Sequence, residues 1–329
     1  MWNNLYLALL APLLLALPAC ALYWPPHFLL SWLSRRYPGV RFTFADELEC
    51  DRAVSPEGGE GVSAGRGRSS KLLALTIDDS VSSPRTTHAI LDVLKRHGAK
   101  ATFFVIGSTL GAARRRPDAE GSAAGTGDGA DDVAAVVERM AVEGHELGNH
   151  LGWDEPSYLL TEEEFGRQLA EVDAVIFPGC PAAAAAAAAA AVSRGPAPGK
   201  SAARSASPTK WFRPGSGFFH GRMLEQVRRA GYTLVLGDNY PHDPVFRSAG
   251  LNSWFISARA RPGGIVIIHD RPWTVDLLER LLPRLAAGGY RLVTLSAMQE
   301  YTGRRRALFV GSKGDNALHD ARTHNKSST

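Results

Sequence analysis

The chain has few of the residues that mark disulfide-bonded, zinc-knuckle or redox domains. Only three of its 329 residues are cysteine, and Cys20, Cys50 and Cys180 show no CxxC spacing. Their spacing excludes a zinc knuckle and a thioredoxin-like redox motif. A Cys50–Cys180 disulfide stays open for an oxidising compartment, but only the number of cysteines supports it.

An excess of charge of one sign is also missing. The sequence has 37 Lys and Arg against 33 Asp and Glu, a net charge of +4. The arginines occur in short, separated groups and form no stripe along one helix. We therefore expect no nucleic-acid partner.

Charge is absent altogether from residues 5–24. This apolar stretch matches the roughly 20 residues that a helix needs to cross a bilayer. It predicts a signal anchor or signal peptide over residues 1–33. Small residues at 18–21 resemble a cleavage region, whereas Tyr23, Trp24 and Trp32 resemble an interfacial aromatic belt and favour a retained anchor with the membrane as partner.

The location of the rest of the chain follows less directly. Arg35, Arg36 and Arg41 follow the apolar stretch, and the positive-inside rule alone would leave them in the cytoplasm. A membrane-anchored or secreted protein with a lumenal or extracellular catalytic domain is nevertheless expected, because of the substrate that the motifs described below imply. The orientation stays open.

One catalytic domain is expected after this segment. Residues 34–70 are rich in Gly, Ser, Arg and Glu toward their end and predict a membrane-proximal linker. The domain is expected over residues 71–302, with low-complexity insertions near 111–131 and at the polyalanine-containing 180–208. Residues 303–329 predict a disordered tail.

Within residues 71–302, apolar runs alternate with stretches of helical spacing. Strands are expected at 72–79, 101–106, 145–150, 232–236, 264–268 and 291–295, and helices at 84–97, 132–143, 161–177, 221–230 and 275–285. Alternating strands and helices predict an α/β fold whose parallel sheet closes, or nearly closes, as a barrel.

Chemically apt side chains follow several of these strands. Asp78 and Asp79 end the first apolar run, and His150 and Asp154 follow the third strand four residues apart. Asp79, His150 and Asp154 would give a metal ion one nitrogen and two oxygen ligands and leave a position open for water. Taken singly, each has a plain structural explanation, such as a helix cap or a loop residue.

Two further strand ends carry groups suited to acyl chemistry. Arg213 begins an RPGSG turn whose glycine-bracketed backbone N–H groups can face an oxyanion. His269 ends the run IVIIH, where a histidine can act as a general acid. Four strand ends that all carry suitable groups are harder to explain as coincidence than any one of them.

The ordered motifs TIDD, GHELGNHxxxD, FRPGSG and GGIVIIHD resemble those of the polysaccharide deacetylases, the NodB homology domain of carbohydrate esterase family four. The resemblance covers about residues 71–301. It implies a distorted (β/α) barrel that removes acetyl groups from glycans such as chitin with a bound divalent metal ion, zinc above all, with cobalt or manganese as alternatives.

The resemblance also implies roles for individual residues. Asp78 would be the general base, oriented by Arg213, and His269 the general acid. Asp79 and His150 would bind the metal. The remaining carry-overs are contacts to substrate by Pro214, by the backbone N–H of Ser216 in the oxyanion hole, and by Ile267 beside the acetyl methyl group.

The chain departs from the family pattern at three places. Asp154 stands where the family has a second histidine, which would favour oxygen-preferring metals. Ser80 and Val81 replace the usual Gly-Pro. The Asp-Trp motif is imperfect: Asp243 is the first candidate for the carboxylate beside His269 and Asp238 the second, and Trp254 is a candidate for the missing tryptophan.

These features predict a metal-dependent hydrolase that removes acetyl groups from a glycan, with N-acetyl favoured over O-acetyl. Two alternatives stay open: a hydrolase of another non-peptide C–N bond, and a non-catalytic glycan-binding barrel. Aromatic residues near the motifs could stack on sugar rings, although aromatics at strand ends are more often core. They are Trp153, Trp211, Phe218 and Phe219.

Overall fold

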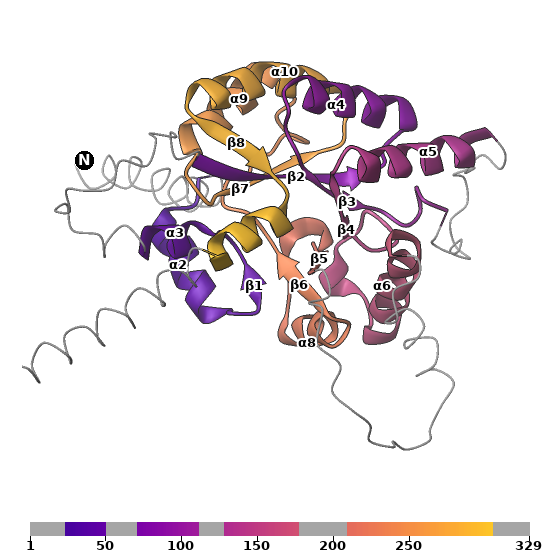
Figure 1. Cartoon of the computed structure of the whole chain (residues 1–329). Coiled ribbons are helices and arrows are strands. Elements are labelled where there is room, and N and C mark those ends of the chain that lie inside the picture. The colour runs from indigo at the N-terminus through magenta and orange to yellow at the C-terminus, as the bar shows by residue number, and fades with distance from the viewer. Residues whose placement is uncertain (1–23, 51–70, 112–127, 178–208, 305–329) are drawn as a thin grey trace, which may run out of the picture.

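A computed structural model describes residues 24–50, 71–111, 128–177 and 209–304 (Figure 1). Their centre is an eight-stranded sheet in which every strand pair is parallel. Seven strands follow the order β1-β6-β5-β4-β3-β2-β7, and β8 pairs with β2. The strands are β1 (Val40–Arg41), β2 (Lys71–Ser80), β3 (Thr102–Val105), β4 (Glu146–Asn149), β5 (Lys210–Phe212), β6 (Tyr232–Val235), β7 (Ile265–His269) and β8 (Tyr290–Val293).

Strand β2 organises the sheet. All of its residues except Lys71 are buried, as expected for a parallel strand covered on both faces. One edge pairs with β3. The same edge pairs with β8 up to Ala74, and the opposite edge pairs with β7 from Ala74 to Asp78. The carboxyl end of β2 therefore lies between β3 and β7.

The sheet curls until its far part meets β7. Asn239, which follows β6, forms a parallel bridge with Val266. The Asn239 N–H donates to the Ile265 carbonyl at 3.2 Å, and the Ile267 N–H donates to the Asn239 carbonyl at 3.0 Å. The expected parallel α/β fold is confirmed, and this bridge nearly closes the barrel.

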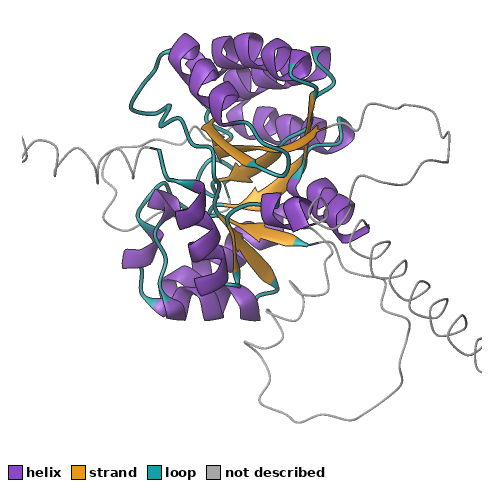
Figure 2. Ribbon diagram, turned by 90° about the vertical axis from the view of Figure 1, so that its left-hand side faces the viewer, coloured by secondary structure: helices purple, strands orange, loops and turns teal. Residues whose placement is uncertain are grey.

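Helices lie outside the curled sheet (Figure 2). Helices α4, α9 and α10 gather beside β2, β7 and β8, whereas α6 and α8 lie beside β4, β5 and β6 (Figure 1). The helices are α2 (His27–Arg36), α3 (Ala45–Cys50), α4 (Pro84–Arg96), α5 (Asp128–Val142), α6 (Glu162–Ile176), α8 (Gly221–Arg229), α9 (Ala249–Arg259) and α10 (Pro272–Ala287), with short 3-10 turns η1 (Ser157–Leu159) and η2 (Gly215–Gly217).

Local sequence explains where several helices begin. The Ser83 hydroxyl accepts the Thr86 N–H at 3.2 Å, and Pro84 occupies the first helical position of α4. The Thr161 hydroxyl accepts the Glu164 N–H at 3.2 Å at the start of α6. Each cap satisfies a backbone donor that has no partner inside its helix. Both helices were predicted within about two residues of these bounds.

The structure corrects the prediction of a linker over residues 34–70. Val40 and Arg41 pair with β6 as β1, and Phe42, Phe44 and Leu48 are buried. The apolar residues at 40, 42 and 44 alternate as a strand requires, but β1 itself is only two residues long. Residues 34–50 therefore belong to the folded domain, whereas 51–70 lie outside the described residues.

Part of the predicted membrane segment also packs on the domain. Leu30 of α2 is buried in one apolar cluster with Val40 and Phe42, and the Trp24 ring meets Phe255 edge-on at 4.9 Å. Residues 1–23 lie outside the described part. Among the residues that are described, no helix is both long and apolar enough to cross a bilayer.

Other predicted segments are described only in part. The insertion near 111–131 falls mostly on 112–127, outside the described residues, and α5 already begins at Asp128. The insertion at 180–208 and nearly all of the tail at 303–329 also lie outside them. Strand β5 and helix α9 were not predicted.

We expect Phe44→Ala to lower the free energy of unfolding by about 3–5 kcal/mol, because it removes a fully buried ring from the core. Phe44 has 0% exposure and lies 6.5 Å from the Trp211 ring. Urea denaturation of the full chain measures the change. Phe28→Ala is the matched control because that side chain is 76% exposed; equal stability of the two variants would contradict the assignment of residues 40–50 to the core.

Candidate active site

The two aspartates lie on an irregularity at the end of β2. The register passes from Ile77 opposite Phe103 to Ser80 opposite Val105, so Asp78 and Asp79 together face one residue of β3. Asp79 has a φ of 58°. A bulge of this kind bends the strand and redirects its side chains. Both carboxylates are buried at the carboxyl edge of the sheet.

Asp78 is held by a buried arginine. Arg213 Nη1 donates to Asp78 Oδ1 at 2.7 Å and to Thr76 Oγ1 at 2.6 Å, and its Nε donates to the Val235 carbonyl at 3.2 Å. The guanidinium also lies 4.3 Å from the centre of the Phe104 ring. Burial lowers the pKa of Arg213 and the Asp78 charge opposes that shift. Asp78 is therefore fixed in place beside a permanent cation.

His150 joins Asp79 to the segment that carries Arg213. Its Nδ1 lies 2.7 Å from the Arg213 carbonyl oxygen, and its Nε2 lies 3.3 Å from Asp79 Oδ1. A carbonyl oxygen only accepts, so Nδ1 carries a hydrogen and Nε2 faces the carboxylate. Burial lowers the pKa of His150, but the hydrogen bond to Asp79 and the charges of both aspartates raise it, to about 9.

Both oxygens of Asp79 have partners. Oδ1 faces His150, and Oδ2 accepts from Arg271 Nη2 at 2.6 Å. Burial raises the pKa of Asp79, but the hydrogen bond and charge of His150 and the charges of His269 and Arg271 outweigh it, so that this pKa is lowered. Asp79 is an ionised carboxylate between two cations.

Asp154 does not join this pair. Its side chain is 64% exposed, and its nearest charged partner is Arg271, at 4.0 Å. Leu151 has a φ of 65° and is fully buried, so the chain turns at once after His150 and does not coil into the helical turn that four-residue convergence needs.

The expected three-ligand metal site is therefore present only in part. The structure brings Asp79 and His150 together but leaves Asp154 apart. Within the described residues there is no group of three or more His, Cys, Asp or Glu side chains that could hold a metal ion. As these side chains stand, they do not fit a divalent ion, and a guanidinium lies against the Asp79 carboxylate.

His269 lies beside Asp78 because the two residues are register partners on β7 and β2. Its Nδ1 is 2.9 Å from Asp243 Oδ1, and its backbone N–H donates to Asp243 Oδ2 at 3.0 Å. Burial lowers the pKa of His269. The hydrogen bond and the charge of Asp243 raise this pKa by a larger amount, so the net shift is upward. Among the described residues, Nε2 has no hydrogen-bond partner, so it is available for proton transfer.

The second candidate for this carboxylate has other partners. Asp238 accepts from the Ile265 N–H at 2.6 Å, from Arg261 at 2.8 Å and from the Thr43 hydroxyl at 3.1 Å. It ties the start of β7 to the segment after β1. Of the two alternatives, the structure places Asp243 against His269.

The RPGSG turn is held tightly beside the site. The Gly215 N–H donates to the Ser157 hydroxyl at 2.7 Å, and a Cβ at Gly215 would lie 2.1 Å from the Glu155 carbonyl oxygen. Pro214 caps η2, and Ser216 has a φ of 64° and is exposed. The oxyanion role of the Ser216 N–H stays a prediction.

Two predicted substrate contacts have different outcomes. Ile267 lies on β7, 9% exposed, two residues before His269. Trp211 is 0% exposed, and its Nε1 donates to Ser296 at 2.9 Å and to Glu146 at 3.2 Å. The prediction that Trp211 contacts substrate is wrong, because its ring is enclosed in the core.

Sequence reasoning missed two groups near the site. Arg271 lies two residues after His269. Its position directly after the His269-Asp270 pair was the feature of the sequence that could have indicated a place near the site. Tyr240 lies with its ring centre 5.7 Å from that of His269, and burial followed by the charge of Asp243 raises its pKa. Trp254, considered for the missing tryptophan, instead lies on α9 at 6.2 Å from Trp24.

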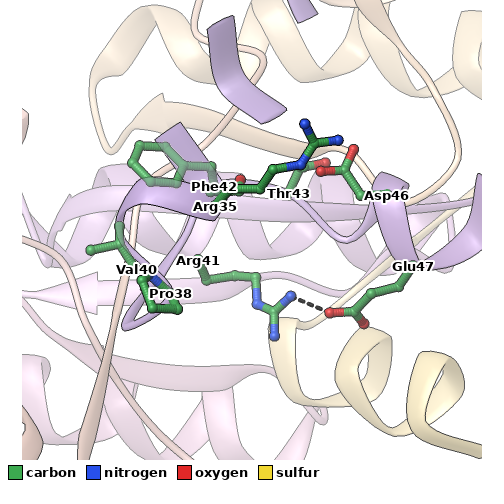
Figure 3. Close-up of a pocket in the computed structure, with 9 residues that line it drawn as sticks. Arg35, Pro38, Val40, Arg41, Phe42, Thr43, Asp46 and Glu47 are labelled. Carbon is green, nitrogen blue, oxygen red and sulfur yellow. Dashed lines mark hydrogen bonds and ion pairs between the residues drawn. The ribbon is translucent and has the colours of Figure 1, made fainter. Parts of the chain in front are cut away.

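A separate cavity of about 290 Å³ lies between α2, β1 and α3 (Figure 3). An ion pair between Arg41 and Glu47 crosses one side of it. No candidate catalytic residue lines this cavity. Its lining residues are Ser34, Arg35, Pro38, Val40, Arg41, Phe42, Thr43, Asp46 and Glu47.

Comparisons with known proteins agree with the motif series. Residues 65–178 match the family model described as polysaccharide deacetylase. The chain is 27% identical over 239 residues to the peptidoglycan-N-acetylglucosamine deacetylase PgdA of Listeria monocytogenes, and this covers 71% of the chain but only 40% of PgdA. It is 27% identical over 246 residues to a chitooligosaccharide deacetylase of Rhizobium leguminosarum, covering 70% of the chain and 92% of that protein.

Solved structures give the same fold. The peptidoglycan deacetylase PdaC of Bacillus subtilis superposes with a TM-score of 0.55 at 24% identity, over 74% of this chain and 98% of that structure. At this identity the similarity establishes the fold, a parallel α/β barrel, and does not identify the substrate.

We expect Asp243→Asn to move the alkaline limb of any activity that needs protonated His269 to lower pH. The raised pKa keeps the imidazolium form present at higher pH, and an amide in place of the carboxylate removes the charge that raises it. A pH–rate profile, or an NMR titration of the His269 ring, measures the shift. An unchanged profile would remove Asp243 from this role, and Asp276→Asn, an exposed position on α10, is the control.

Proposed function

We propose that the chain, whose residues 65–178 match the polysaccharide deacetylase family model, hydrolyses N-acetyl groups of a glycan, acting on a C–N bond that is not a peptide bond. One observation carries the proposal. Asp78 and His269 are register partners at the carboxyl ends of adjacent strands, and each is held by its own partner, Arg213 or Asp243.

The pair suits a base and an acid acting on opposite sides of one bond. Asp78 accepts a proton from water, whose oxygen bonds to the acetyl carbonyl carbon. The C–N bond then breaks while His269 Nε2 gives its proton to the leaving amine. The products are acetate and a free amino sugar, and the proton taken by Asp78 balances the one lost by His269.

The positions of the supporting groups agree with these steps. Arg213 keeps Asp78 oriented, and its buried hydrogen bonds leave it little freedom to move. Asp243 holds the His269 Nδ1–H, so that Nε2 faces outward as the donor. The Ser216 N–H is proposed to stabilise the oxyanion. These steps use the chain's own groups, because only Asp79 and His150 of the expected metal ligands lie together.

The substrate class is proposed from the relatives and from the surface beside the site. PgdA is named for peptidoglycan and the Rhizobium relative for chitooligosaccharides; both polymers carry N-acetylated sugars. Next to η2, the rings of Phe218 and Tyr158 meet edge-on with centres 5.6 Å apart. Phe218 is 63% exposed, which suits it to stack on a sugar ring.

We expect Asp78→Asn to lower acetate release by about a hundred-fold to ten-thousand-fold, as for loss of a general base. Asparagine keeps an oxygen for Arg213 but leaves the buried guanidinium without its counter-charge, so thermal melting must accompany the assay. His269→Asn is the second variant, because it leaves the Arg213–Asp78 ion pair intact. Either variant, folded and fully active on N-acetylated peptidoglycan fragments or chitooligosaccharides, would contradict the proposal.

We expect Phe218→Ala to raise KM for oligosaccharides by about 5-fold to 30-fold with kcat nearly unchanged, since loss of one stacking contact of about 1–2 kcal/mol weakens substrate and transition state alike. Steady-state kinetics on oligomers of increasing length measures the change. Phe28→Ala, on α2, serves as the aromatic control. A fall in kcat with KM unchanged would place Phe218 elsewhere in the mechanism.

A further inference from the structure

Arg271 is placed by the junction between β7 and α10. It follows His269 and Asp270, and Pro272 occupies the first helical position directly after it. The backbone of Arg271 is extended, with φ −141° and ψ 157°. Because β7 ends two residues before Arg271 and α10 begins one residue after it, the backbone position of Arg271 is fixed.

The guanidinium reaches back to the end of β2. Nη1 donates to the Asp270 carbonyl at 3.0 Å, and Nη2 donates to Asp79 Oδ2 at 2.6 Å. The same Nη2 lies 4.0 Å from Asp154 Oδ2. The Arg271 side chain is 26% exposed and that of Asp79 only 7%. The cation therefore closes the outer side of a buried carboxylate.

This position conflicts with the metal site expected from the sequence. The expected ligands were Asp79, His150 and Asp154, yet the positive group that lies against Asp79 and nearest to Asp154 belongs to the chain itself. With His150 on one oxygen and Arg271 on the other, Asp79 has no oxygen without a partner. A divalent ion bound to Asp79 would lie close to this guanidinium, and like charges at such distances repel each other.

We propose that Arg271 is the resident counter-cation of Asp79 and competes with divalent metal ions for that carboxylate. A metal ion can be bound by Asp79 and His150 only after the Arg271–Asp79 ion pair opens. Arg271 is then a positioning residue that sets how tightly the chain holds a metal. The inference deepens the proposed function but concerns metal affinity and not acetate release.

The energetic reason lies in burial. Asp79 is nearly enclosed, and an unpaired buried carboxylate is costly. Arg271 removes that cost in the metal-free chain. The binding free energy of a metal ion is therefore only the difference between its interaction with Asp79 and the interaction of the guanidinium with Asp79. Removing the guanidinium leaves Asp79 paired with His150 alone and makes a second cation more favourable.

The test is calorimetric titration of metal-free full-length protein with Zn²⁺, Co²⁺ and Mn²⁺. We expect Arg271→Gln to bind at least one of these ions about tenfold or more tightly than the unchanged chain, the size of effect typical of groups next to metal ligands. The d–d absorption of Co²⁺ gives a second readout. Arg284→Gln, an exposed arginine in the last turn of the same helix, should bind as the unchanged chain does.

Two further variants decide between explanations. Arg271→Lys keeps the charge and should bind metal within about threefold of the unchanged chain, so tight binding by this variant would overturn competition by charge. Asp79→Asn combined with Arg271→Gln should lose the gained affinity, and retained affinity would place the metal elsewhere. Equal or weaker binding by Arg271→Gln would overturn the proposal outright. These titrations give their answer whether or not any variant releases acetate.

Discussion

The register between β2 and β7 is the constraint on which the site depends. It sets Asp78 opposite His269, and no rotation of either side chain could replace that pairing if the strands slipped by one residue. A slip would send each side chain to the other face of the sheet. Both strands are buried along nearly their whole length, so the hydrophobic core fixes the distance between the proposed base and the proposed acid.

Charge balance is the second requirement, because the strand ends hold two buried carboxylates. Asp78 faces Arg213, and Asp79 faces His150 and Arg271. Buried ion pairs contribute little net stability, but removal of one partner is costly. Each cation comes from a different part of the sheet: Arg213 follows β5, His150 follows β4 and Arg271 follows β7. The site can therefore form only when most of the barrel has formed.

The sequence predicted the groups at the strand ends better than it predicted their contacts. Long apolar runs and helix caps gave β2, α4 and α6, because those signals are local. Strands β1 and β5, of two and three residues, are too short for a periodic signal. The Arg271–Asp79 bond spans 192 positions, and the turn at Leu151 that separates Asp154 from His150 depends on a positive φ at a buried leucine. Tertiary packing decides both, and neither leaves a pattern along the chain.

His269, which ends β7, and the two residues after it contact different parts of the site. His269 lies beside Asp78, and Arg271 reaches Asp79. Between them, the Asp270 N–H donates to the Asp78 carbonyl at 2.8 Å, and the Asp270 carboxylate accepts from the Ser82 hydroxyl at 2.9 Å and the Thr87 hydroxyl at 2.6 Å.

Asp270 thus anchors the turn that leaves β2 while its neighbours contact the two aspartates. Burial raises the pKa of Asp270 and the hydrogen bonds from Thr87 and Ser82 oppose the shift. A change in the path of β7 would move the proposed acid, the counter-cation of Asp79 and the support of the β2 turn together. The proposed proton-transfer geometry and the proposed metal affinity therefore depend on one short segment, because the same backbone positions both.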